Sequence, residues 1–117
     1  MPTHLKIDYI ELPAADFDAV EAFYRKAFGW TFERHGEGYR SFSDGRLDGG
    51  FYHADNHSSQ ATGAALVILH ADDIEAVQRA VEDAGGTILA PAFAFPGGRR
   101  FHFADPHGNE LAVWSER

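Results

Sequence analysis

The chain has 117 residues, a formal net charge of −8 and no cysteine, and 44% of its residues are hydrophobic. This composition predicts one folded domain with its own hydrophobic core, and it excludes disulfides and a membrane span, because no apolar run is long enough. The acidic charge argues against a nucleic acid partner, since binding to a phosphate backbone requires clustered lysine and arginine side chains.

The sequence of residues 1–53 predicts one strand, then a helix, then three more strands. Residues 5–12 alternate in polarity as a strand does, and Pro13 is expected to end that strand. Asp16 is placed to cap a helix that Gly29 closes, and apolar residues between them recur at spacings of three and four. Three more strands are predicted in this half: from Trp30, over residues 39–43 and over residues 47–53.

Residues 64–117 predict the same order of elements, after a polar, turn-rich linker over residues 54–63. Asp72 or Asp73 caps the second helix, and a Gly-Gly pair ends it. The four predicted strands of this half run over residues 64–70, 87–94, 99–104 and 110–115.

The two halves are an internal repeat. Shifting the sequence by 57 positions superposes Asp16 on Asp73 and Tyr9 on Leu66. Two copies of one βαβββ unit predict a single α+β domain built from two units in tandem.

These residues also resemble a known family. The order of D…AFY…FGW, GGF, DDI…AGG and DPHGN before an apolar strand is similar to that of the vicinal oxygen chelate superfamily. That group includes glyoxalase I, extradiol dioxygenases, fosfomycin-resistance enzymes and bleomycin-resistance binding proteins. The resemblance covers nearly the whole chain and implies two curved half-barrels. Their concave sides would form a ligand cavity, and the helices would cover the convex sides.

The resemblance also implies where a metal would bind in this fold. Metal-dependent members place one ligand on the first strand of each unit, and these positions are Tyr9 and Leu66 here. The last strand of each unit supplies a carboxylate, and the corresponding positions are Ala112 and, within residues 49–53, Tyr52 or His53. At most one of the four positions holds a credible donor. The chain therefore resembles the metal-free branch, and no cofactor is expected.

Alternation along the strands predicts which side chains face the cavity. If Ala112 points inward, Glu110 and Trp114 do so too, while Leu111 and Val113 face the helix. Apart from Glu110, the predicted ligand-binding residues are Tyr9, Glu11, Tyr52, His53, Leu66, Ile68, His102, Ala112 and Trp114.

Several of these residues have two readings. Glu110 is the candidate catalytic residue, as a general base or as a partner for a cationic group, or else it is a solvated side chain at the cavity rim. Tyr9 and Trp114 either stack on a flat ligand or fill the core. Four histidines, His53, His70, His102 and His107, are candidates for a relocated metal site.

Three functions remain open on this basis. The first is a small-molecule binder without turnover, and the second is a lyase, isomerase or dioxygenase that uses Glu110 or a relocated histidine site. The third is a regulatory subunit that uses the cavity face for protein contact. Half-barrels leave exposed strand edges, so we expect a homodimer with composite cavities. The lack of cysteine and of a secretory signal favours a cytoplasmic location.

Overall fold

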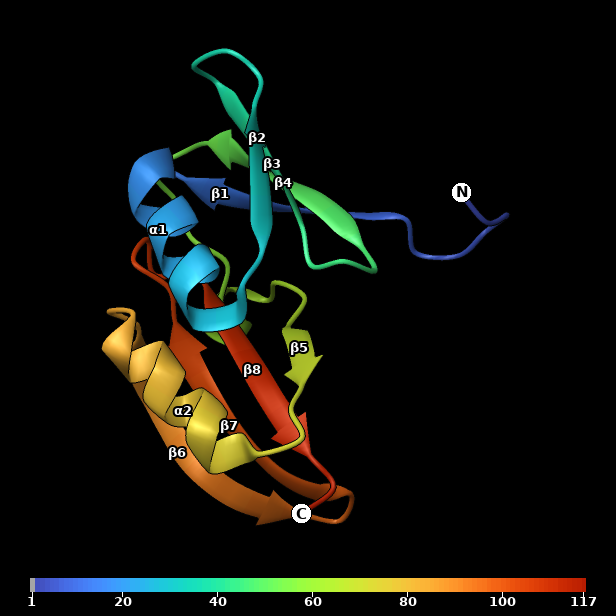
Figure 1. Cartoon of the computed structure of the whole chain (residues 1–117), viewed down its shortest axis with the longest axis vertical. Helices are drawn as coiled ribbons and strands as arrows, with labels where there is room; N and C mark the ends of the chain where they lie inside the picture. The colour runs from blue at the N-terminus through green and yellow to red at the C-terminus, as the bar shows by residue number, and fades with distance from the viewer. Residues whose placement is uncertain (1) are drawn as a thin grey trace.

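Two four-stranded sheets, each accompanied by one helix, make up the computed structural model, which describes residues 2–117 (Figure 1). In the first sheet the strand order is β1-β4-β3-β2, and β1 runs parallel to β4. The elements of this first unit are β1 (Tyr9–Ala14), α1 (Phe17–Phe28), β2 (Thr31–Arg34), β3 (Tyr39–Ser43) and β4 (Asp48–His53).

The second sheet repeats this topology, with strand order β5-β8-β7-β6 and a parallel pair of β5 and β8. Its elements are β5 (Val67–His70), α2 (Ile74–Asp83), β6 (Thr87–Phe95), β7 (Gly98–Ala104) and β8 (Glu110–Ser115). The α+β fold of two tandem βαβββ units, predicted from the repeat, is therefore confirmed.

Side-chain chemistry at the helix ends explains where the helices start and stop. Oδ1 of Asp16 accepts a hydrogen bond from the backbone N–H of Ala19 at 3.1 Å, and Gly29 ends α1 in the left-handed region at φ 73°. In the second unit, Asp73 rather than its neighbour caps α2, through the N–H of Ala76 at 3.1 Å.

The first strand was predicted too early in the chain. It begins at Tyr9 and continues through Pro13, which an edge strand tolerates because the missing N–H faces no neighbour. Ahead of it, Leu5 takes a positive φ of 59°, which interrupts extended backbone. Residues 2–8 therefore leave the sheet and project from the body of the molecule (Figure 1), with Leu5 88% exposed.

The segment between the units is also more structured than predicted. It contains a 3₁₀ helix, η1 (Gln60–Thr62), and the next strand begins at Val67 rather than at Ala64. The backbone N–H of Gln60 donates to Glu110, so this segment reaches the last strand of the chain.

The core is shared between the units because the two helices contact each other and side chains of α1 reach the second sheet. Phe23 of α1 lies against Phe103 of β7, with ring centroids 5.9 Å apart. Trp30 is stacked between Tyr24 at 4.5 Å and Phe42 at 4.6 Å. Burial of each such aromatic side chain stabilises the fold by roughly 1.5–3 kcal/mol.

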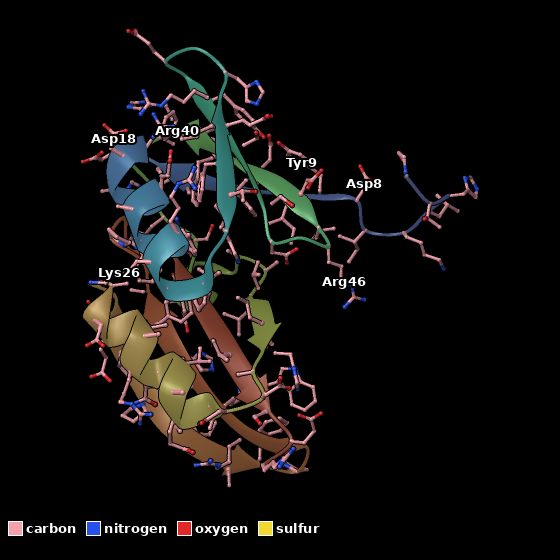
Figure 2. All side chains as sticks on the ribbon, viewed as in Figure 1. Asp8, Tyr9, Asp18, Lys26, Arg40 and Arg46 are labelled. Atoms are coloured by element: carbon pink, nitrogen blue, oxygen red, sulfur yellow. The ribbon has the colours of Figure 1, made fainter. Side chains whose placement is uncertain are left out.

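One buried arginine fixes α1 to its own sheet. Arg40 of β3 donates to Asp18 at 2.8 Å and to Glu21 at 3.0 Å, and Figure 2 shows Asp18 and Arg40 together beside the first turn of α1. The Arg40 guanidinium holds the pKa of Asp18 below its ordinary value. This contact fixes α1 against the side of the first sheet that carries Arg40.

No helix within residues 2–117 is long and apolar enough to cross a membrane.

Candidate ligand-binding site

The second sheet presents one apolar face to the core and one mixed face away from it. Leu111 and Val113 of β8 are fully buried, as the alternation predicts. On the other face, the strand register places two rows of side chains side by side. The rows are Ile68, Ala112 and His102, followed by His70, Trp114 and Arg100.

Three polar side chains on this face form a continuous hydrogen-bonded chain. Nε of Arg100 lies 3.1 Å from Nε2 of His102, and Nδ1 of His102 lies 2.8 Å from Oε2 of Glu110. The other carboxylate oxygen of Glu110 accepts from the backbone N–H of Gln60 at 3.0 Å. Both carboxylate oxygens of Glu110 are therefore hydrogen-bonded within the chain, so Glu110 is not simply a solvated side chain at the cavity rim.

The hydrogen bonds around His102 have a defined direction. Nε of Arg100 donates to Nε2 of His102, so Nδ1 is the ring nitrogen that donates to Glu110. Partial burial alone would raise the pKa of Glu110. Hydrogen bonds from His102 and Gln60, with the positive charge of Arg100 nearby, bring that pKa below its ordinary value instead.

Aromatic rings surround this polar chain. Phe93 is stacked on the His102 ring, with centroids 5.9 Å apart and an interplanar angle of 26°. The Arg100 guanidinium lies 5.9 Å from the Phe95 centroid, and Phe95 meets Trp114 edge to face at 6.4 Å. Two open hollows of about 570 and 430 Å³ adjoin these residues, and Arg100 and Phe95 line both.

The corresponding face of the first sheet carries a second hydrogen-bonded cluster. The hydroxyls of Tyr9 and Tyr39 lie 2.6 Å apart, and Tyr39 donates to Oε2 of Glu11 at 2.9 Å. Burial, together with the hydrogen bonds to Tyr9 and Glu11, raises the pKa of Tyr39 well above its ordinary value. Gly50 permits this arrangement, because a Cβ at that position would approach Tyr39 Oη to 1.9 Å.

Tyr52 and His53, adjacent in β4, lie on opposite faces of the first sheet. Tyr52 shares the face of Glu11 and is 38% exposed. His53 points to the helix side, where its ring meets that of Phe17 at 6.3 Å. The structure thus places His53 on the opposite face from Glu11 and Tyr52, which were predicted with it as ligand-binding residues. Leu66 precedes β5 and is half-buried.

The predicted residues do not meet in one cavity. No hollow described within residues 2–117 is lined both by Tyr9 or Glu11 and by His102 or Trp114. A hollow of about 760 Å³ lies between the two units, where Trp30 and Phe28 line it together with Ile68, His70 and Trp114 of the second sheet. We place the candidate site on the second sheet because polar and aromatic groups converge there.

Arg100, Phe93, Phe95 and Tyr39 were missed by the sequence analysis. Arg100 carried a usable signal, because it stands two residues before His102 and so shares its face. Phe93 and Phe95 lie in a strand whose register is irregular, and Tyr39 becomes informative only through its partners on other strands. Alternation alone did not identify these three residues.

The residues present do not fit the metal centre that the fold implies. The four positions hold Tyr9, Leu66, Ala112 and the Tyr52 or His53 alternative, and the structure turns His53 to the other face. Across residues 2–117 no three His, Cys, Asp or Glu side chains are grouped so that they could hold an ion.

The other histidines have separate partners. His70 pairs with Glu116 at 2.6 Å. His107 accepts from the N–H of Ala15 at 3.2 Å and is hydrogen-bonded to the carbonyl of Asn56 at 2.8 Å. His107 therefore ties loops together and does not act as a free donor.

Comparison with known proteins agrees with this architecture. The model of the glyoxalase/bleomycin resistance protein/dioxygenase superfamily matches residues 6–113. The anthracycline biosynthesis protein DnrV of Streptomyces peucetius is 33% identical over 126 aligned positions, which cover 91% of this chain and 45% of that protein. DauV of Streptomyces sp. (strain C5), also an anthracycline biosynthesis protein, is 32% identical over the same shares. The chain thus spans about half the length of these curated relatives.

Solved structures share the fold at low sequence identity. A glyoxalase-related enzyme from Fulvimarina pelagi is 21% identical with a TM-score of 0.75, over 95% of this chain and 88% of that one. The fosfomycin resistance protein FosX of Listeria monocytogenes, solved with Mn(II), is 13% identical with a TM-score of 0.79, over 96% and 90%. Such identities establish the fold alone.

Proposed function

The chain belongs to the glyoxalase/bleomycin resistance protein/dioxygenase superfamily, and on that premise we propose that it binds a flat aromatic organic molecule on the free face of its second sheet. The observation that carries this proposal is the grouping of Phe95, Trp114 and Phe93 around the Arg100–His102 pair. Exposed rings beside a few fixed polar groups are typical of a small-molecule site.

The curated relatives support the same class of ligand. Both carry the description anthracycline biosynthesis protein, and anthracyclines contain a flat polycyclic ring system. A ring system of this kind can stack on Trp114 and Phe95 without requiring specific hydrogen bonds. Because the chain spans only about half of those relatives, a polycyclic aromatic compound is the proposed ligand class, and no individual compound is assigned.

We further propose a homodimer in a cytoplasmic setting. Tyr9 of the first-sheet cluster and the residues of the second-sheet site line different hollows within one chain. Pairing with a second copy would cover the exposed edges of β1 and β5 and would supply opposite walls for each cavity. The absence of cysteine supports a reducing compartment.

The side chains at the metal positions of the fold do not converge on one point, so we favour ligand binding without metal catalysis. One observation favours a second candidate, an acid–base enzyme. The imidazole of His102 is hydrogen-bonded to Glu110 at 2.8 Å, an arrangement that orients a histidine for proton transfer. Nε2 of His102 would have to exchange its bond to Arg100 for one to substrate.

Isothermal titration with anthraquinone-2-carboxamide, an uncharged three-ring probe, tests the proposal. We expect saturable binding that Trp114→Leu weakens roughly tenfold through loss of stacking. Tyr52→Leu is the matched control, because it removes an exposed aromatic ring from the other sheet. Absence of binding, or binding that the Trp114 change does not affect, would overturn the proposed site.

The enzyme candidate requires a separate readout. If the His102–Glu110 pair transfers protons, Glu110→Gln should abolish conversion of the substrate while the variant still binds that substrate with the parent's affinity. If the protein only binds, the variant and the parent bind equally and neither consumes the ligand.

A further inference from the structure

Arg100 is only partly engaged by its neighbours. Its Nε donates to His102 at 3.1 Å, whereas no hydrogen bond or ion pair among residues 2–117 uses its two terminal nitrogens. These nitrogens carry four N–H donors in a rigid plane, and their spacing matches that of the two oxygens of a carboxylate. The donors belong to a residue that borders both hollows of the candidate site.

The neighbours hold this guanidinium in place. His102 accepts from Nε, and its other ring nitrogen donates to Glu110, which the backbone N–H of Gln60 holds in turn. Phe95 lies 5.9 Å from the guanidinium carbon. A donor fixed in this way loses little freedom when it binds a ligand, so it binds more tightly than a mobile lysine or arginine would.

The adjacent arginine shows the difference between the two sides of β7. Arg99 forms an ion pair with Glu75 of α2, and it also donates to the carbonyl of Arg117. Its charge is therefore neutralised within the chain. Among residues 2–117, Arg100 has no carboxylate as a direct partner, because His102 stands between it and Glu110.

We propose that Arg100 recognises a carboxylate carried by the aromatic ligand, an inference that rests on the proposed binding of a flat aromatic molecule to this face. The ring system stacks on Trp114 and Phe95, and the carboxylate takes two parallel hydrogen bonds from the terminal nitrogens of Arg100. His102 and Glu110 act as positioning residues that hold the Nε side of the fork. The ligand class is thus an aromatic carboxylic acid.

A pair of probes separates this inference from the proposed function. Anthraquinone-2-carboxylate and anthraquinone-2-carboxamide share one ring system and differ in charge. Isothermal titration of the full chain should show the carboxylate binding roughly tenfold more tightly, because hydrogen bonds between charged groups are stronger than neutral ones. Arg100→Gln should remove that preference, with a much larger loss of affinity for the carboxylate than for the carboxamide.

Three further variants sharpen the test. Arg99→Gln removes the same charge from the opposite side of the strand and should retain the preference. Arg100→Lys keeps the positive charge but loses the two parallel donors of the guanidinium, so it should retain only part of the preference for the carboxylate. His102→Phe keeps a ring beside Phe93 but removes the acceptor for Nε of Arg100, so it should weaken binding of the carboxylate more than binding of the carboxamide.

Each outcome has a definite meaning. Equal affinity for the two probes overturns carboxylate recognition and leaves the proposed function standing. Failure of both probes to bind overturns both proposals. A preference that survives Arg100→Gln, or that disappears with Arg99→Gln, overturns the assignment to Arg100.

Discussion

The hydroxyl of Tyr24 donates a 2.8 Å hydrogen bond to Oδ2 of Asp105, and this bond joins α1 of the first unit to the turn between β7 and β8 of the second. The same carboxylate accepts from both nitrogens of Asn109 at 3.0 Å, and Asn109 also donates to the carbonyl of Pro13 at 2.8 Å. The DPHGN segment is therefore more than a tight turn. It holds the two units together around a buried carboxylate.

Tyr24→Phe should destabilise the protein by about 1–3 kcal/mol, because it leaves the buried Asp105 carboxylate without one of its donors. Urea unfolding followed by fluorescence measures the change. Tyr52→Phe serves as the control, since that side chain is exposed, and its cost should stay below about 0.5 kcal/mol. Equal stability of the Tyr24 variant and the parent would contradict the structural role of the bond.

Gly50→Ala should disrupt the Tyr39 cluster, because the new Cβ would approach Tyr39 Oη to 1.9 Å. Overpacking of this kind costs about 1–3 kcal/mol. A double-mutant cycle with Tyr39→Ala measures the coupling: once Tyr39 is truncated, the cost of Gly50→Ala should largely disappear. Additive costs would show that Gly50 is required for another reason.

Glu110 predicts a pH dependence of stability. Its pKa in the folded chain lies below its ordinary value of 4.5, so its ionised form stabilises the folded state at pH values above 4.5. That contribution is lost as pH falls below 4.5 and through the lowered folded-state pKa. The stability difference between the parent and Glu110→Gln should therefore be largest near neutral pH and shrink in acid.

Urea unfolding at a series of pH values checks this behaviour, with Glu37→Gln as the control. Glu37 is exposed and forms no hydrogen bond or ion pair through its side chain within residues 2–117. Its substitution should leave the pH profile unchanged. A Glu110→Gln profile parallel to that of the parent would contradict the stabilising hydrogen bonds to His102 and Gln60.

Sedimentation equilibrium tests the proposed homodimer. A species of twice the 12.9 kDa chain mass is expected at micromolar concentration, because β1 and β5 leave one side of each sheet unpaired. A monomer at all concentrations would contradict composite cavities and would confine the candidate site to a single chain.

Local chemistry made most of the fold predictable from the sequence. Asp16 and Gly29 mark the ends of α1 through side-chain capping and backbone freedom, which need no tertiary information. Pro13 was misjudged because its tolerance depends on β1 lying at a sheet edge, which only the assembled sheet reveals. The DPHGN segment was noted for its resemblance to the family, but the link from Asp105 to Tyr24 spans 81 residues and carries no local signal.

The candidate site was predictable only in part. Alternation placed Glu110, Ala112 and Trp114 on one face of β8, and the register agrees. It could not choose between Tyr52 and His53, because the choice depends on which face of β4 meets the helix. Hydrogen bonds between strands, such as the one from Arg100 to His102 and onward to Glu110, follow from three-dimensional pairing.

The most direct test of the account is to follow the two indole N–H signals of ¹⁵N-labelled protein while anthraquinone-2-carboxamide is added. Trp114 lines a hollow on the proposed face and also borders the hollow between the units, whereas Trp30 is buried and lines the hollow between the units. The account predicts a saturable shift of the Trp114 signal with Trp30 unchanged. A shift of Trp30, or no shift of either signal, would contradict binding on the free face of the second sheet.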